Sequence, residues 1–126
     1  MKEEIRTSKA PNPVGPYSQG IKSGGRVYVS GQGPLDPETG KMPDGIVAQT
    51  HQVLKNIRSI LEAGGASMDD VVKTTVHLTH MGHFKEFNEI YEQYFSHPYP
   101  VRTTVQSTLP GTFFVEIDVI AEKDRD

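Results

Sequence analysis

The chain has 126 residues, a net charge of −3 and no cysteine. Its length suggests one domain over residues 1–126, and the lack of cysteine excludes disulfides, thiolate nucleophiles and cysteine-based metal sites. No apolar run approaches the roughly 20 residues that span a bilayer, and the charged first residues do not resemble a secretory signal. We therefore expect a cytoplasmic protein. Its negative net charge disfavours nonspecific electrostatic binding to nucleic acid.

The first third of the sequence indicates three short strands separated by turns. Three prolines and a glycine at 10–16 predict an ordered loop, and Gly24-Gly25 predicts a hairpin turn. The expected strands are residues 2–7, 17–23 and 26–30.

The rest of the chain alternates between helical and strand patterns. After a turn-rich loop, apolar residues recur at helical spacing from Ile46, with Val47 on the apolar face, until Gly64-Gly65 ends the helix. Alternation then predicts a strand over 71–78 whose apolar face includes Val72. A second helix follows. Its apolar stripe consists of Phe84, Phe87, Tyr91, Tyr94 and Phe95.

Two further strands, 101–106 and 113–121, complete the predicted fold. We expect an α+β domain in which a mixed β-sheet has two helices packed on one face. The other face then has no helix to cover it. Apolar residues there, with Phe114 and Ile120 as candidates, need a partner, and a second copy of the chain is the simplest one.

Two sequence patterns resemble a phosphate loop and a metal site, but their surroundings do not fit either function. Gly31-Gln32-Gly33 resembles a phosphate loop, but Pro34 follows and no helix begins there to receive a phosphate. Three evenly spaced histidines are expected in a strand, at its end and near a helix start, whereas a metal site needs its ligands on one fixed face. They are His77, His80 and His83. Surface and loop positions explain this series, and no metal is expected.

Three polar residues stand out from their surroundings. Arg102 opens a strand, and its guanidinium fork matches a carboxylate, although most arginines are solvated surface residues. Glu116 lies among apolar residues, which suits either acid–base work in a partly dry site or an ion pair at a subunit contact. Asn88 lies in the second helix, where a cap or a polar contact are equally open readings.

The sequence also resembles the RidA family over nearly its whole length. The matching stretches include Gly15-Pro16-Tyr17-Ser18-Gln19, Val29-Ser30-Gly31-Gln32, Asp70-Val71-Val72-Lys73-Thr74-Thr75-Val76, Pro100-Val101-Arg102 and Val115-Glu116-Ile117-Asp118. Each stretch alone is weak. Together, in order and at the family's spacing, they are highly specific.

The resemblance implies a chorismate-mutase-like fold and a homotrimer whose sheets line a central barrel, with a site at each subunit interface. It also implies a deaminase that hydrolyses 2-iminobutanoate and 2-iminopropanoate to 2-oxo acids and ammonia. Such an enzyme protects pyridoxal-phosphate enzymes from these reactive imines and uses no cofactor of its own.

The resemblance further assigns roles to individual residues. Arg102 binds the substrate carboxylate, and Glu116 orients the attacking water. The pocket is lined by Tyr17, Ser30, Gly31, Asn88 and Thr104. This sequence departs from the family at Thr104, where cysteine is frequent, and at Gly33, where the family has a larger apolar residue. The departures concern the side-chain preference of the pocket rather than the reaction.

Two other functions stay open. The same arginine pocket could hold a 2-oxo acid without turnover, as in a regulatory protein. An endoribonuclease or translation inhibitor is also reported in the family, but the acidic balance and the lack of an aromatic and basic surface disfavour RNA binding.

Overall fold

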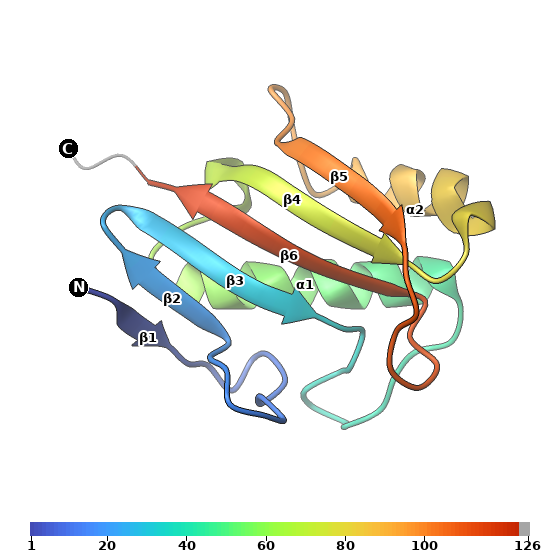
Figure 1. The fold of residues 1–126 in the computed structure, drawn as a ribbon, viewed down its shortest axis with the longest axis horizontal. Coiled ribbons are helices and arrows are strands. Elements are labelled where there is room, and N and C mark those ends of the chain that lie inside the picture. The colour runs from blue at the N-terminus through green and yellow to red at the C-terminus, as the bar shows by residue number, and fades with distance from the viewer. Residues whose placement is uncertain (124–126) are drawn as a thin grey trace.

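The structure is a computed structural model that describes residues 1–123; residues 124–126, the end of the expected domain, lie outside this range. It contains six strands, two α-helices and two 3₁₀ turns (Figure 1). In chain order they are β1 (Glu3–Ile5), β2 (Gly20–Ser23), β3 (Arg26–Gln32), α1 (Ile46–Ala63), η1 (Met68–Asp70), β4 (Val71–Leu78), η2 (Met81–His83), α2 (Phe84–Tyr91), β5 (Val101–Gln106) and β6 (Val115–Glu122).

The strands form one mixed sheet in the order β1-β2-β3-β6-β4-β5. Every neighbouring pair is antiparallel except β4 and β5, which run parallel because α2 connects them as a crossover. Both helices lie behind the sheet in the view of Figure 1, so the predicted α+β architecture is confirmed. Within residues 1–123, no helix is long and apolar enough to cross a membrane.

The core lies between α1 and the sheet. The helical spacing of apolar residues correctly predicted the buried stripe of α1, in which Val53, Leu54 and Ile57 are completely buried. Val47 was predicted on this face but is exposed, and Ile46 is the buried residue of the first turn instead.

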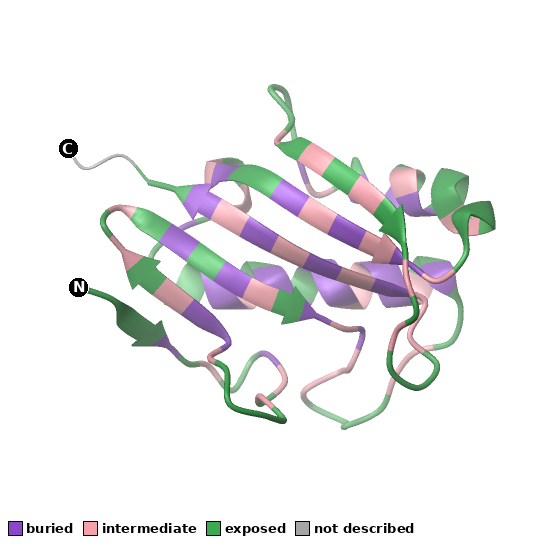
Figure 2. Cartoon of the chain, in the orientation of Figure 1, coloured by how far each residue is buried: buried purple, intermediate pink, exposed green. Residues whose placement is uncertain are grey.

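The second face of the sheet is open in the single chain. Along β6, buried residues alternate with half-exposed ones, which Figure 2 shows as alternating bands. Ile120 of β6 lies opposite Tyr28 of β3 on this open face, and Val101 of β5 is 67% exposed. Phe114 was expected here, and that expectation was wrong: it precedes β6 and packs against the core, with its ring 5.0 Å from that of His83. The remaining apolar residues still leave this face in need of a partner.

One buried face and two element boundaries in the second half of the chain differ from the prediction. A register irregularity at the start of β4 turns Val72 outward, so Val71 is buried in its place. The second helix ends at Tyr91, because the following residues tighten into i→i+3 turns, and it therefore excludes the last two aromatic residues of the predicted stripe. The last strand begins at Val115 rather than Phe113.

Gln19 explains why β2 begins at Gly20 rather than Tyr17. Its buried side chain accepts a hydrogen bond from the N–H of Thr7 at 2.8 Å and donates to the carbonyl oxygens of Thr7 and Pro11 at 3.0 and 2.9 Å. These bonds satisfy the backbone of the proline-rich loop. They also engage Thr7, so β1 ends earlier than predicted, at Ile5.

Replacing Gln19 with alanine is expected to lower the free energy of unfolding by about 2–3 kcal/mol, because it leaves buried backbone groups without partners. Urea unfolding followed by circular dichroism, at equal protein concentration, measures this change. Gln93→Ala is the matched control: Gln93 is exposed, and its side chain donates a hydrogen bond to the Glu89 carbonyl of its own helical turn. Equal losses in the two variants would contradict the role of Gln19.

Candidate functional site

Arg102 lies on β5 with its guanidinium over three aromatic rings of the second helix. Its Cζ atom is 4.8 Å from the ring centre of Tyr91 and 5.6 Å from those of Phe84 and Phe87. Neither of the ion pairs formed within residues 1–123 includes Arg102. The charge is therefore stabilised by ring faces, and the planar N–H fork is available for a carboxylate.

The local sequence builds this aromatic cradle in two steps. Phe84, Phe87 and Tyr91 are spaced at i, i+3 and i+7, so α2 presents them on one side. Thr74 of β4 is the register partner of Arg102, and its hydroxyl lies 2.9 Å from that of Tyr91. Burial raises the pKa of Tyr91, although Thr74 and the charge of Arg102 act in the opposite direction. A neutral Tyr91 ring is thus anchored directly beneath the guanidinium.

Thr104 and Asn88 lie on the same side of the sheet as Arg102. Thr104 is two residues further along β5 and half-buried, opposite the completely buried Val76. Asn88 is in α2, and its Oδ1 atom is buried and has no hydrogen-bond partner among residues 1–123. A buried amide oxygen of this kind is costly unless something donates to it, so Asn88 offers an acceptor to a ligand N–H.

Glu116 lies on β6 and faces Gly31 of β3. A Cβ atom built on Gly31 would be 2.6 Å from Glu116 Oε2, so the carboxylate occupies the space where a side chain would be. The register between β3 and β6 shifts between Val29 and Gln32, which places Ser30 and Gly31 in an irregular segment. Ser30 is held there because its hydroxyl and its N–H both donate to the Gln19 carbonyl at 3.0 Å. Bulges often re-aim side chains next to active sites.

Gly31→Ala is expected to lower kcat for 2-imino acid hydrolysis, the activity that the family resemblance implies, by about 10–100-fold, because the new methyl group displaces the Glu116 carboxylate. The melting temperature and the size of the assembled protein should stay close to those of wild type. Gly31 does not have a positive φ, which only glycine would favour, so alanine fits its backbone conformation. Gly82→Ala, where an added Cβ meets open space, is the control. An unchanged kcat in Gly31→Ala would mean that the position of this carboxylate does not matter.

Tyr17 lies near Ser30 on the same side of the molecule as the Gly31 segment. Its ring is 48% exposed, and its hydroxyl accepts a hydrogen bond from the N–H of Val14 at 3.2 Å. Tyr17 and Ser30, with Tyr28, line a shallow cavity of about 400 Å³. These residues and Glu116 form a second cluster, separate from that of Arg102.

The two clusters lie on opposite faces of the sheet. Arg102 pairs with buried Thr74 and contacts α2, so it is on the helix-covered face. Glu116 pairs with half-exposed His77, and it alternates with buried Val115 and Ile117, so it is on the open face. One chain therefore does not bring the predicted carboxylate-binding and water-orienting residues together.

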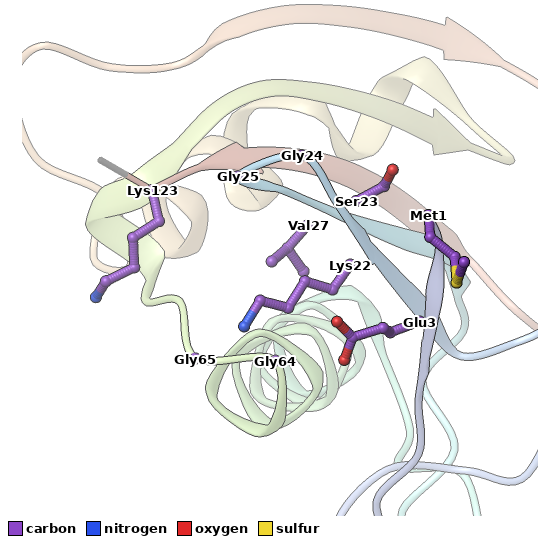
Figure 3. Close-up of a pocket in the computed structure, with 10 residues that line it drawn as sticks. All are labelled: Met1, Glu3, Lys22, Ser23, Gly24, Gly25, Val27, Gly64, Gly65 and Lys123. Atoms are coloured by element: carbon purple, nitrogen blue, oxygen red, sulfur yellow. The ribbon is translucent and has the colours of Figure 1, made fainter. Parts of the chain in front are cut away.

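Another cavity, of about 450 Å³, lies at the far end of β3 from Gly31 (Figure 3). Lys22, Lys123 and Glu3 contribute its charged groups, and none of the predicted site residues lines it. The cavity borders Gly64 at the C-terminal end of α1, where the partial negative charge of a helix already favours cations. The position of the two lysines is explained by this helix end.

The histidine series occupies the places that the sequence indicated. His77 is on β4, where its Nδ1 atom lies 2.8 Å from the Ser107 hydroxyl, and His83 ends η2. In the described part of the chain, no three His, Asp or Glu residues group in a way that could hold a metal ion.

The sequence missed the aromatic residues of the Arg102 cluster as functional residues. Phe84, Phe87 and Tyr91 were assigned to a core stripe, and Phe87 and Tyr91 are indeed buried, whereas Phe84 is 39% exposed. The spacing of these residues in the sequence already indicated that their rings lie on one side of the helix. However, an aromatic stripe alone does not reveal that an arginine, rather than an aliphatic side chain, covers it.

The chain belongs to the family described as Endoribonuclease L-PSP, whose sequence model matches residues 7–123. It is similar to a RutC family protein of Pyrococcus horikoshii, with 49% identity over 98% of this chain and 100% of that protein. It is also similar to the 2-iminobutanoate/2-iminopropanoate deaminase of Mus musculus, with 44% identity over 96% of this chain and 91% of that protein.

Solved structures of relatives have the same fold. RidA from the Antarctic bacterium Psychrobacter sp. PAMC 21119 matches with a TM-score of 0.92 and 46% identity, over 95% of this chain and 98% of that one. TdcF from E. coli, crystallised with bound serine, matches with a TM-score of 0.92 and 37% identity, over 97% of this chain and 99% of that one. The resemblance to RidA and the predicted fold are both confirmed.

Proposed function

We propose that the protein hydrolyses small 2-imino acids, 2-iminobutanoate and 2-iminopropanoate, to 2-oxo acids and ammonia. The observation that carries this proposal is Arg102: a half-buried guanidinium, seated on three aromatic rings, that forms no ion pair within residues 1–123. Such a group is suited to a small carboxylate. The name of the mouse relative supports the reaction. We place the enzyme in the cytoplasm, where these imines arise.

The active site, on this proposal, is shared between copies in a homotrimer. Arg102 and Glu116 lie on opposite faces of one sheet, so a substrate that touches both must lie between two chains. The open face supports association, because it leaves Tyr28, Ile120 and Val101 partly or largely exposed. Covering it with further copies buries these side chains and brings the Glu116 cluster of one chain to the Arg102 cluster of the next.

The reaction mainly requires the protein to position the substrate and the attacking water. Arg102 holds the α-carboxylate through two parallel N–H bonds, while the unpartnered Oδ1 atom of Asn88 accepts the imine N–H. Glu116 of the neighbouring chain holds a water against C2 and accepts its proton as the C–O bond forms. That proton passes to nitrogen and gives a carbinolamine at C2. The hydroxyl proton of the carbinolamine then moves to nitrogen through Glu116, the C–N bond breaks as the C=O bond forms, and ammonia leaves with the 2-oxo acid. Water is added and ammonia eliminated without net oxidation or reduction, so the chemistry calls for no redox cofactor.

A coupled assay tests the proposal. Threonine dehydratase generates 2-iminobutanoate from threonine, and semicarbazide traps the imine that escapes hydrolysis. The wild-type protein is expected to suppress the trapped product in proportion to its concentration. Unchanged trapping at micromolar protein, together with measurable binding of 2-oxobutanoate, would instead identify a 2-oxo acid-binding protein without turnover.

Ribonuclease activity is a second candidate, favoured by the name of the family. The net charge of −3 opposes it, because binding to the phosphate backbone depends on basic surface. RNA cleavage that persists in Arg102→Ala after nuclease-free purification would support this candidate over the deaminase.

A further inference from the structure

The Gly31-Gln32-Gly33 sequence, set aside as a phosphate loop, has a different structural purpose. Gly31 leaves room for the Glu116 carboxylate, and Gly33 does the same for an aromatic ring. A Cβ atom on Gly33 would be 2.7 Å from Cζ of Phe113 and 2.9 Å from its Cδ2. The Phe113 ring therefore lies directly against the Gly33 backbone.

Phe113 and Glu116 both lie against the glycine segment at the end of β3, the Glu116 carboxylate at Gly31 and the Phe113 ring at Gly33. Residues two apart in extended backbone face the same way, and Gln32 between the glycines is buried toward the helices. Gly31 therefore faces away from the helices, beside the Glu116 carboxylate, and Gly33 follows Gln32 directly after the end of β3 with the Phe113 ring against it. The N–H of Phe113 also donates to the Pro110 carbonyl at 3.2 Å, which fixes its backbone in a turn.

We propose that Phe113, seated on Gly33, is the specificity-determining residue that limits the length of the side chain on the imino acid. The inference rests on the proposed function. The half-buried ring forms a rigid apolar wall beside the water-orienting carboxylate. Side chains of one or two carbons fit in front of it, whereas branched and aromatic side chains meet the ring. The wall carries no group that hydrogen-bonds, so it selects by size.

The test compares imines of different size. Threonine dehydratase supplies 2-iminobutanoate, and an L-amino-acid oxidase with catalase supplies the imines of leucine and phenylalanine. The readout is the ratio of kcat/KM for the leucine imine to kcat/KM for 2-iminobutanoate. Phe113→Ala is expected to raise this ratio at least about 10-fold, and Phe113→Leu by a smaller factor. Gly33→Ala, which forces the ring to move without removing it, should also change the ratio.

Phe114→Leu is the matched control, because Phe114 is the neighbouring phenylalanine but packs on His83 and the core. Its ratio should equal that of wild type. A merely structural role for Phe113 would lower turnover of all imines alike and leave the ratio unchanged, which would overturn the inference. If Phe113→Ala fails to fold, Phe113→Leu and Gly33→Ala decide the question in the same way.

Failure of the proposed function looks different. If the wild-type protein turns over none of the imines, the deaminase proposal fails, and the size limit is then measured by calorimetry with 2-oxobutanoate and 4-methyl-2-oxopentanoate. A gain in relative affinity for the longer acid in Phe113→Ala would still support the wall. If the ratio of the two affinities is the same in wild type and Phe113→Ala, the inference that Phe113 limits side-chain length is wrong.

Discussion

Arg102→Ala is expected to lower kcat/KM for 2-iminobutanoate by about 10²–10³-fold, because the carboxylate loses its charge-assisted fork in a partly buried site. Arg102→Lys keeps the charge but not the planar pair of donors, and it should recover only part of the loss. The threonine dehydratase and semicarbazide assay measures both variants. Affinity for 2-oxobutanoate should fall in parallel, since the same carboxylate is held in substrate and product.

Arg58→Ala provides the matched control for this experiment. Arg58 also lies over a tyrosine ring, with its Cζ atom 5.6 Å from the ring centre of Tyr94, but it lines a different cavity, to which none of the predicted site residues contributes. Its kcat/KM should stay within about twofold of wild type. Comparable losses in both variants would indicate that removing an arginine from an aromatic ring harms the fold, and full activity in Arg102→Ala would refute the carboxylate assignment.

Glu116→Gln should lower kcat by about 10²–10³-fold while 2-oxobutanoate binds almost as well as to wild type. The amide keeps the shape of the side chain beside Gly31, but it does not accept a proton from the attacking water. Pre-steady-state measurement of imine disappearance, together with calorimetric binding, separates the chemical step from affinity.

Asp118→Asn is the control for the carboxylate at position 116. Asp118 is on the same face of β6, two residues away, and burial raises its pKa while His77 and Lys73 act in the opposite direction. It has no assigned role in the reaction, so its kcat should remain near wild type. If Asp118→Asn loses as much activity as Glu116→Gln, the effect belongs to the charge of the open face and not to one positioned carboxylate.

Much of the fold follows from local pattern. The helical stripe of α1 and the alternation along β4 predicted most of the buried residues of these two elements, because burial against one layer imposes a period on the sequence. The exceptions have local physical causes. Val72 turns outward at a register irregularity, and Gln19 replaces strand pairing with side-chain hydrogen bonds to the loop. Neither effect has a periodic signal.

The functional site was harder to predict from the sequence than the fold. Residue type suggested Arg102 and Glu116, and the family resemblance assigned their roles. That they lie on opposite faces follows from strand order and register, which a long crossover through α2 and a shifted β3–β6 pairing determine. The contacts of Gly31 with Glu116 and of Gly33 with Phe113 join residues some 80 positions apart in the sequence. A single sequence read by pattern does not contain those distances.

The sharing of one site by two chains is tested most directly by mixing two inactive variants. Arg102→Ala and Glu116→Gln are unfolded together in equal amounts and refolded, so that their chains assemble at random. Each variant alone is expected to be nearly inactive. The mixture should recover about one quarter of wild-type activity, because a competent site needs Arg102 from one kind of chain and Glu116 from the other. Activity of the mixture no higher than that of the separate variants, in assemblies shown by mass to contain both chains, would contradict a site built between subunits.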